Sequence, residues 1–397
     1  MINTPSFYRA NNDEHQTIKY ILCAQIIINI VLLWSYNYLA HASIINSVLL
    51  TLLNIAVAFI EYGNQTKLLY VINVYFQAIF QLITDYLSLN YFIFITQDFI
   101  NWSSPLGAIV IVLTFLLMYL PTIVIIWPKI TNNVTRLLMS FLLIITLMSS
   151  FALSIDHTVV TNNSFVAMLA TTEVLDAIVL FIISIIAMHS WGYKLPGYRL
   201  ARNTNLWVMV GLLLFGIWFL LQNSFGSGNS IIASYFTFDF SGFNLKLKYI
   251  FAGLEAGIAE ETVFRYMLLT ILLTMFKRFK YNVFYSALIS SLLFGSVHIS
   301  NLSAGQDLPN TLIQVLSAFG LGMMFASIYL YTGLFIWPVL FHTLIDVLSF
   351  TQSGMLMSGK VGIGDVIALV IMVIIYLAIS LSLLYLVYKR QRNPYSF

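Results

Sequence analysis

The amino-acid sequence predicts an all-α, polytopic membrane protein with about twelve transmembrane helices. Of its 397 residues, 60% are apolar and only 8% are charged, and the mean hydropathy is +0.90. Many of the apolar runs are also long enough to cross a hydrocarbon core of roughly 30 Å. A backbone that faces lipid must satisfy its own hydrogen bonds, so each span is expected to be an α-helix.

The distribution of basic residues supports this organisation. The expected spans cover residues 19–40, 43–61, 68–97, 105–127, 136–155, 164–191, 204–222, 247–276, 281–298, 311–331, 334–350 and 363–388. With this arrangement, most of the eighteen Lys and Arg residues fall at span ends on one side of the membrane. Because basic residues favour the cytoplasmic side, both termini are expected in the cytoplasm.

The N-terminal end resembles no cleaved leader. Residues 1–18 are polar, and no small-residue cleavage site follows the first apolar run, so this run is expected to remain as a span. The single Cys23 excludes an internal disulfide. The Ile- and Asn-rich, cysteine-poor composition suits a bacterial plasma membrane. The lipid bilayer is an expected partner and nucleic acid is not; the sequence leaves the oligomeric state open.

One internal boundary is apparent. The segment 192–203, GYKLPGYRLARN, is polar and basic and is interrupted by Pro196 and two glycines, which predicts a cytoplasmic linker. It separates an N-terminal six-span region, 1–191, from a C-terminal membrane domain, 204–397. The role of the first region is not readable from its sequence.

The C-terminal domain carries ionisable residues inside expected spans, where each costs about 2.5–3.5 kcal/mol to insert. These residues are Glu260, Glu261, Arg265, His298, His342 and Asp346. Glu261 and Arg265 are four residues apart and can pair on one helix face. Glu260 points about 100° away around the helix, which leaves it free to meet a partner from another span.

Two histidines are candidate partners for Glu260. Counting from the basic turn at Lys277–Lys280 puts Glu261 about 24 Å and His298 about 27 Å along their helices, so His298 is the expected neighbour. His342 is only about 15 Å along its helix from the turn that precedes it, so its depth differs from that of Glu261 and His298. The depths agree if the basic hairpin at Lys277–Lys280 protrudes from the membrane or if the turn near Gly333 is recessed. Asp346, four residues after His342, is expected to orient that imidazole.

These residues resemble the motifs of the CPBP (CAAX protease and bacteriocin-processing, or Abi) intramembrane proteases. The family pattern is Glu-Glu-x-x-x-Arg, Phe-x-x-x-His and His-x-x-x-Asn or Asp on three helices. The chain has EETVFR at 260–265, FGSVH at 294–298 and HTLID at 342–346. The resemblance covers about 247–350 and extends over a helical core to about 388.

The resemblance implies hydrolysis of a peptide bond in a membrane-associated peptide or protein, such as a bacteriocin or signalling peptide. Glu260 would be the general base on a water, helped by His298, and His342 with Asp346 would stabilise the oxyanion. Two accounts of the cofactor stay open. In one, Glu260, His298 and His342 bind Zn²⁺; in the other, no metal is used. HExxH is absent, so an ordinary zincin is not expected.

Two other functions compete with hydrolysis. The chain could be a non-catalytic scaffold or immunity protein on the same fold. It could also be a proton-coupled transporter, since buried carboxylates relay protons and the N-terminal half offers Asp85, Glu173 and Asp176. Glu173 and Asp176 are expected on one helix face. Many carriers are built from two repeats with related sequences. The N- and C-terminal halves of this sequence show no such related pattern.

Overall fold

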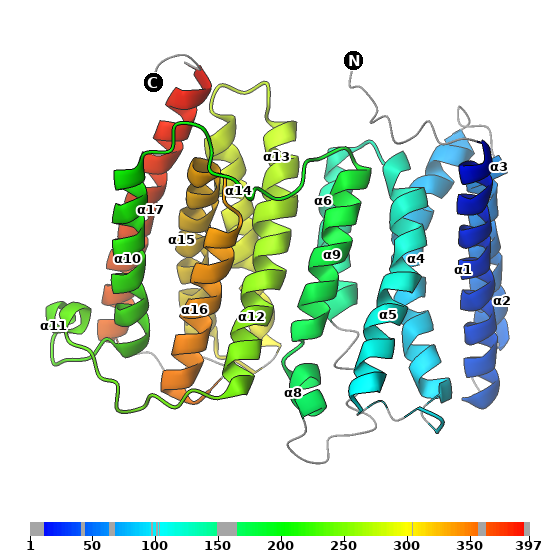
Figure 1. Cartoon of the computed structure of the whole chain (residues 1–397), viewed down its shortest axis with the longest axis horizontal. Coiled ribbons are helices and arrows are strands. Elements are labelled where there is room, and N and C mark those ends of the chain that lie inside the picture. The colour runs from blue at the N-terminus through cyan, green and yellow to red at the C-terminus, as the bar shows by residue number, and fades with distance from the viewer. Residues whose placement is uncertain are drawn as a thin grey trace. The chain divides into compact units, whose positions relative to one another are not determined.

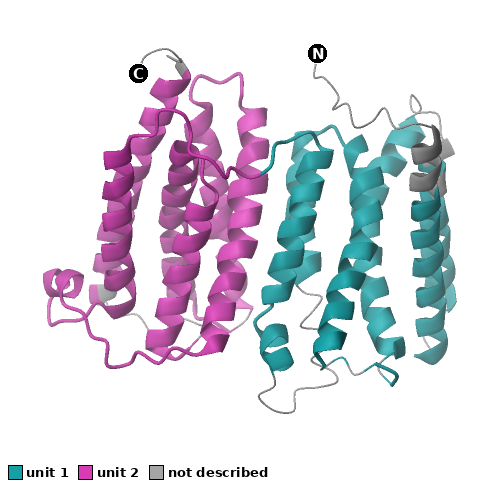
Figure 2. Ribbon diagram, viewed as in Figure 1, with its two compact units in different colours: residues 1–195 teal, residues 196–397 magenta. Residues whose placement is uncertain are grey.

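A computed structural model describes residues 12–40, 44–62, 68–96, 98–100, 102, 104–148, 165–303, 305–355 and 363–392. These residues form helices and no strands (Figure 1). Contacts divide the chain into two compact units, residues 1–195 and 196–397 (Figure 2). The division falls inside the segment 192–203 that the sequence indicates as a linker.

Unit 1 is a helical bundle with several irregular turns. Its helices are α1 (Asn12–Leu39), α2 (Ile44–Ile55), η2 (Ala56–Ala58), α3 (Phe59–Tyr62), α4 (Leu68–Thr96), α5 (Pro105–Pro121), η3 (Thr122–Ile126), η4 (Trp127–Lys129), α6 (Asn133–Met148), α8 (Phe165–Thr171) and α9 (Val174–Ser190). Helix α4 contacts α1, α5 and α6, and α9 packs on α5 and α6. The segment η3 is a π-helix directly after Pro121, whose ring lacks the N–H that a regular helix needs.

Unit 2 contains the helices on which the motifs lie. They are α10 (Leu206–Phe225), α11 (Ile231–Phe236), α12 (Leu247–Glu261), η5 (Thr262–Leu268), α13 (Leu269–Met275), α14 (Asn282–Val297), η6 (His298–Leu302), α15 (Leu308–Thr332), α16 (Ile336–Ser353) and α17 (Ile363–Arg392). The main helix pairs are α12 with α16, α14 with α15, and α15 with α17. Their shared interior is apolar and includes Phe219, Met324 and Tyr376.

The surface of the described helices is strongly apolar, as expected for a protein embedded in lipid. Exposed side chains include Leu69, Leu117, Trp207 and Leu214. Polar side chains such as Gln77 are instead buried. This arrangement of polar groups inside and apolar groups outside supports a membrane-embedded protein.

The predicted number of twelve spans is not confirmed. Among the described residues, seven helices are long and apolar enough to cross a membrane, or up to eight if the bent pair α8 and α9 is one span. Ile44–Ile55 and Asn133–Met148 are apolar but shorter, and the end of the predicted span 136–155 lies outside the described residues. The predicted spans 247–276 and 334–350 are helical, yet their polar residues keep them out of the seven.

The expected pairing of Glu173 and Asp176 on one helix face needs correction. Helices α8 and α9 meet at a 57° bend, and Glu173 lies between them with a left-handed φ of 53°. Asp176 instead belongs to the first turn of α9. A continuous helix was assumed from the apolar sequence, whereas the left-handed residue breaks it.

The turn between α15 and α16 removes the discrepancy in depth. Gly333 ends α15 with a φ of 73°, which a glycine adopts at no steric cost. The segment that starts unit 2 binds this turn, because Ala201 donates its N–H to Thr332 O at 2.7 Å and Phe335 donates to Gly197 O at 2.7 Å. Figure 1 shows the hairpin between α13 and α14 reaching beyond this turn. The charged hairpin therefore protrudes, and His342 reaches the level of Glu261.

Candidate active site

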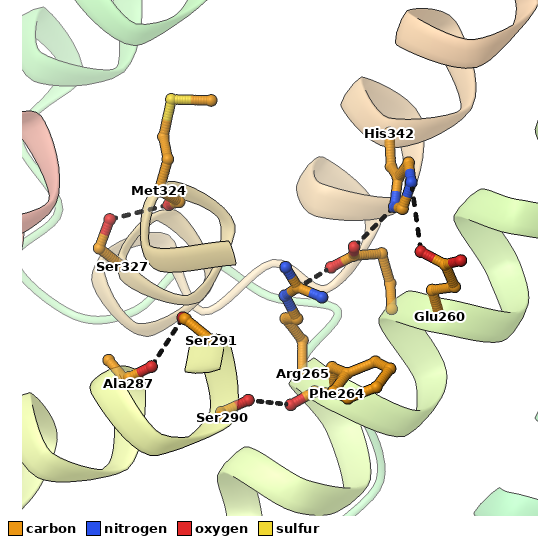
Figure 3. Close-up of polar contacts among 10 residues, drawn as sticks. Glu260, Phe264, Arg265, Ala287, Ser290, Ser291, Met324, Ser327 and His342 are labelled. Carbon is orange, nitrogen blue, oxygen red and sulfur yellow. Dashed lines mark hydrogen bonds and ion pairs between the residues drawn. The ribbon is translucent and has the colours of Figure 1, made fainter. Parts of the chain in front are cut away.

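The site is assembled from helices distant in sequence. The end of α12 supplies Glu260 and Glu261, the following π-helix η5 supplies Arg265, and α16 supplies His342 and Asp346. Figure 3 shows Glu260 and His342 facing one another across the α12–α16 contact, with Arg265 on the next turn.

His342 is the centre of the polar contacts. Its Nδ1 lies 2.8 Å from Glu261 Oε1. Its Nε2 lies 3.6 Å from Glu260 Oε2 and 3.5 Å from Asp346 Oδ2. A carboxylate accepts hydrogen bonds, so the contact with Glu261 favours a proton on Nδ1 and leaves Nε2 directed at the other two carboxylates. One imidazole thus contacts three carboxyl groups.

The three carboxyl groups differ in exposure. Glu261 is completely buried, whereas the Glu260 side chain is 25% exposed and that of Asp346 is 22% exposed. Glu261 therefore suits a fixed supporting role. Glu260 and Asp346 are the partly exposed carboxyl groups beside His342, and the Glu260 Oε2 that faces the ring is itself buried.

Arg265 compensates the buried charge of Glu261. Its Nε lies 3.0 Å from Glu261 Oε2, and its guanidinium stands over the Phe294 ring at 4.1 Å and near the Phe325 ring at 5.6 Å. A buried ion pair needs good geometry to offset desolvation, and a cation over an aromatic face gains further stabilisation. This confirms the predicted i, i+4 pair and adds an aromatic enclosure that spacing alone did not indicate.

Glycines allow α12 and α16 to approach closely enough for these contacts. A Cβ added at Gly257 would lie 2.2 Å from Thr343 Oγ1 and 2.9 Å from the Thr343 nitrogen. A Cβ added at Gly253 would lie 2.5 Å from Val347 Cγ2. Small residues four apart permit such approach between helices, so the GLEAG segment was a signal for this contact.

The turn that carries Arg265 is a π-helix, not the α-helix expected. Leu269 donates its N–H to Phe264 O, the π-type bond, and the Ser290 hydroxyl donates to the same carbonyl at 2.7 Å (Figure 3). Single π-helical turns often occur at functional sites. The irregular turn is therefore tied to α14 by a buried side chain.

His298 does not have the expected position beside Glu260. It begins η6, and its ring contacts that of Phe294 at a centroid distance of 5.3 Å. The Phe294 ring also lies 5.9 Å from the His342 ring, edge to face. Among the described residues, no hydrogen bond or ion pair joins His298 to Glu260. Depth counted along each helix could not reveal that the Phe294 ring contacts both imidazoles.

The roles expected for Glu261 and Asp346 also change. Asp346 is close to His342, as predicted, but the shorter contact is with Glu261. From helical spacing Arg265 was the partner expected for Glu261, because such spacing indicates partners on the same helix and not those on another. Glu261 contacts His342 through Oε1 and Arg265 through Oε2.

The candidate ligand set Glu260, His298 and His342 does not fit a metal ion in this arrangement. In the described ranges, no group of three or more His, Cys, Asp or Glu side chains is positioned to hold one. The Phe294 ring contacts both imidazoles.

Comparison with known proteins matches part of the chain to a family. Residues 242–348 match the family model described as type II CAAX prenyl endopeptidase Rce1-like. The matched segment contains all six candidate site residues. No curated protein and no solved structure matches the chain.

Proposed function

Because residues 242–348 carry a domain of the CPBP family, we propose that the chain is a membrane endopeptidase that hydrolyses a peptide bond in a membrane-associated peptide or protein. The observation that carries the proposal is the contact of one imidazole, His342, with carboxyl groups on two helices. Peptide hydrolysis needs a base for the water and a group that stabilises the oxyanion, and this cluster offers both.

Glu260 is the proposed general base. Its Oε2, His342 Nε2 and Asp346 Oδ2 converge with separations of 3.5–3.6 Å to Nε2. Such separations exceed a good direct hydrogen bond and suit groups that share a water. In the proposed step, Glu260 takes a proton from that water, and the oxygen of the water attacks the scissile carbonyl carbon.

His342 is the proposed electrophilic group. Glu261 fixes the ring through Nδ1, so Nε2 keeps one direction. With a proton on each ring nitrogen, the ring donates from Nε2 to the oxygen of the tetrahedral intermediate, then gives the Nε2 proton to the leaving amine and keeps the one on Nδ1. Arg265 acts through Glu261 by keeping that carboxylate charged and in place.

Asp346 and His298 have secondary roles in this proposal. An ionised Asp346 cannot donate to an oxyanion, so it helps to hold the proton on His342. The resemblance assigns His298 to water activation, and its contact with Phe294 supports a role at the margin of the cluster. We further propose that the protein lies in a cell membrane with both termini cytoplasmic.

The test compares membrane peptides, by mass spectrometry, from cells that produce the wild-type chain or Glu260→Gln. A second arm uses the purified full chain in proteoliposomes with membrane-anchored peptides. Products that appear only with the wild-type chain support the proposal. An unchanged product profile with Glu260→Gln contradicts it and favours the scaffold or immunity function on the same fold.

A further inference from the structure

Unit 1 contains a buried polar cluster that peptide hydrolysis does not use. Asp85 on α4 is completely buried. Its Oδ1 accepts from Gln25 Nε2 at 2.6 Å and from Asn29 Nδ2 at 3.1 Å, both on α1, and its Oδ2 accepts from the Thr122 hydroxyl at 2.9 Å. Gln25 Nε2 also donates to Met118 O at 2.6 Å. Two helical segments, α1 and η3, thus direct polar groups at one carboxylate of a third, α4.

The cluster has more acceptors than donors. Gln25 Oε1 and Asn29 Oδ1 are buried and have no hydrogen-bond partner among the described residues. Each of these oxygens belongs to an amide group whose nitrogen already contacts Asp85. Two buried acceptors without donors are costly, because each has lost water without a compensating partner. A positive charge beside Asp85 would balance the carboxylate, and both amide oxygens would contact it once the amide groups turn.

The backbone around the cluster is also irregular. Pro121 ends α5, and the π-helix η3 begins at Thr122. The Thr122 N–H donates to Tyr119 O, while the carbonyl of Met118 accepts from the Gln25 side chain. In membrane proteins, interrupted helices direct carbonyl oxygens at bound cations. The cluster therefore combines a carboxylate, a hydroxyl and a main-chain carbonyl with two side-chain amides.

We propose that this cluster, formed by Asp85, Gln25, Asn29, Thr122 and the Met118 carbonyl, binds one monovalent cation with the chemistry of Na⁺. With the two amide oxygens turned toward Asp85, all its ligands are hard oxygen donors, which suit such an ion. One carboxylate balances one positive charge, so the occupied site is neutral in a medium that penalises net charge. A divalent ion would leave an uncompensated charge.

The amides switch partners when the ion binds. A half-turn of the Gln25 and Asn29 amide groups exchanges nitrogen for oxygen in the same position. With nitrogen toward Asp85, the amides solvate the free carboxylate. With oxygen toward it, they coordinate the cation, and Met118 O is released by Gln25 to do the same. Unit 1 is thereby a cation-binding module with an activity separate from the hydrolysis proposed for unit 2.

The experiment measures thermal unfolding of the purified full chain in detergent, in NaCl, KCl or choline chloride at constant ionic strength. Binding to the folded state alone raises the midpoint in a saturable way. We expect NaCl to raise the midpoint above that in choline and KCl, and radioactive ²²Na⁺ to bind with one ion per chain. No difference among the three salts and no bound ²²Na⁺ would overturn the proposal; in that case a neutral Asp85 or an internal water satisfies the cluster.

Variants assign the effect to this cluster. Asp85→Asn should abolish both signals. Thr122→Val preserves side-chain shape and should weaken Na⁺ affinity about tenfold, which keeps the proposal testable if Asp85→Asn does not fold.

Asp176→Asn removes another buried carboxylate of unit 1 and should keep the effect. Glu260→Gln should also keep it, so failure here is distinguishable from failure of the proposed hydrolase. Na⁺ stabilisation that persists in Asp85→Asn or in Thr122→Val at unchanged affinity contradicts the assignment.

Discussion

His342 Nδ1 and Glu261 Oε1 are 2.8 Å apart, although 81 positions separate the two residues in the chain. The other oxygen of Glu261 holds Arg265 at 3.0 Å. A buried carboxylate thus connects an arginine on its own helical segment to a histidine on another. This connection fixes the direction of the imidazole that faces Glu260 and Asp346, and several predictions depend on it.

Glu260→Gln is expected to reduce peptide cleavage by about 10²- to 10⁴-fold, because an amide cannot accept the proton of the attacking water. The fold should be retained, since the Glu260 side chain is partly exposed and its contact with His342 is long. Cleavage in proteoliposomes and the unfolding midpoint are measured together. Glu255→Gln, on the same helix, is the matched control and should cleave normally. Equal activity of the two variants would remove Glu260 from the mechanism.

Glu261→Gln is expected to lower kcat more than Asp346→Asn does. The contact of His342 with Glu261 is a short hydrogen bond, whereas that with Asp346 is 3.5 Å. Loss of a charge-assisted hydrogen bond corresponds to about tenfold or more in rate. Steady-state kinetics of both variants in proteoliposomes give the comparison. A larger loss in Asp346→Asn would return the orienting role to that residue.

Arg265→Met is expected to destabilise unit 2 by about 3–5 kcal/mol, because it leaves Glu261 charged and buried without its cation. The double variant Glu261→Gln with Arg265→Met should be more stable than Arg265→Met alone, since it removes the uncompensated charge. Unfolding midpoints of the wild type, both single variants and the double variant provide the cycle. Additive effects would show that the two side chains do not interact.

Gly257→Ala is expected to lower both stability and activity. Its Cβ would meet the Thr343 hydroxyl and backbone, so α12 and α16 must separate, at a cost of about 1–3 kcal/mol. Separation also moves His342 from Glu260 and Glu261. Gly211→Ala is the control, because nothing lies within 4 Å of the added Cβ. A Gly257→Ala protein with normal cleavage and midpoint would show that close helix contact is not required.

Part of the site could be predicted from sequence spacing. The pair Glu261 and Arg265 follows from a separation of four on one helix, and the ionisable residues stand out because the surrounding segments are apolar. The choice between His298 and His342 could not be predicted. It depends on how α12, α14 and α16 pack, and the Phe294 ring contacts both histidines only in the folded unit.

The same limit applies to the polar cluster of unit 1. The sequence marks Asp85 as a carboxylate in an apolar span, and it gives no partner for it. Gln25, Asn29 and Thr122 lie 60, 56 and 37 positions away, and only the packing of α1, α4 and η3 directs them at one carboxylate.

The sequence by itself determined that this is a helical membrane protein and which residues are costly enough in lipid to need partners. Those properties depend on composition and on spacing within one helix, both of which are local. The tertiary structure alone decided the partners, the π-helical turns at both polar clusters and the close approach at Gly257. Contacts between helices depend on side-chain volume and direction at positions far apart in the chain, and no local pattern contains that information.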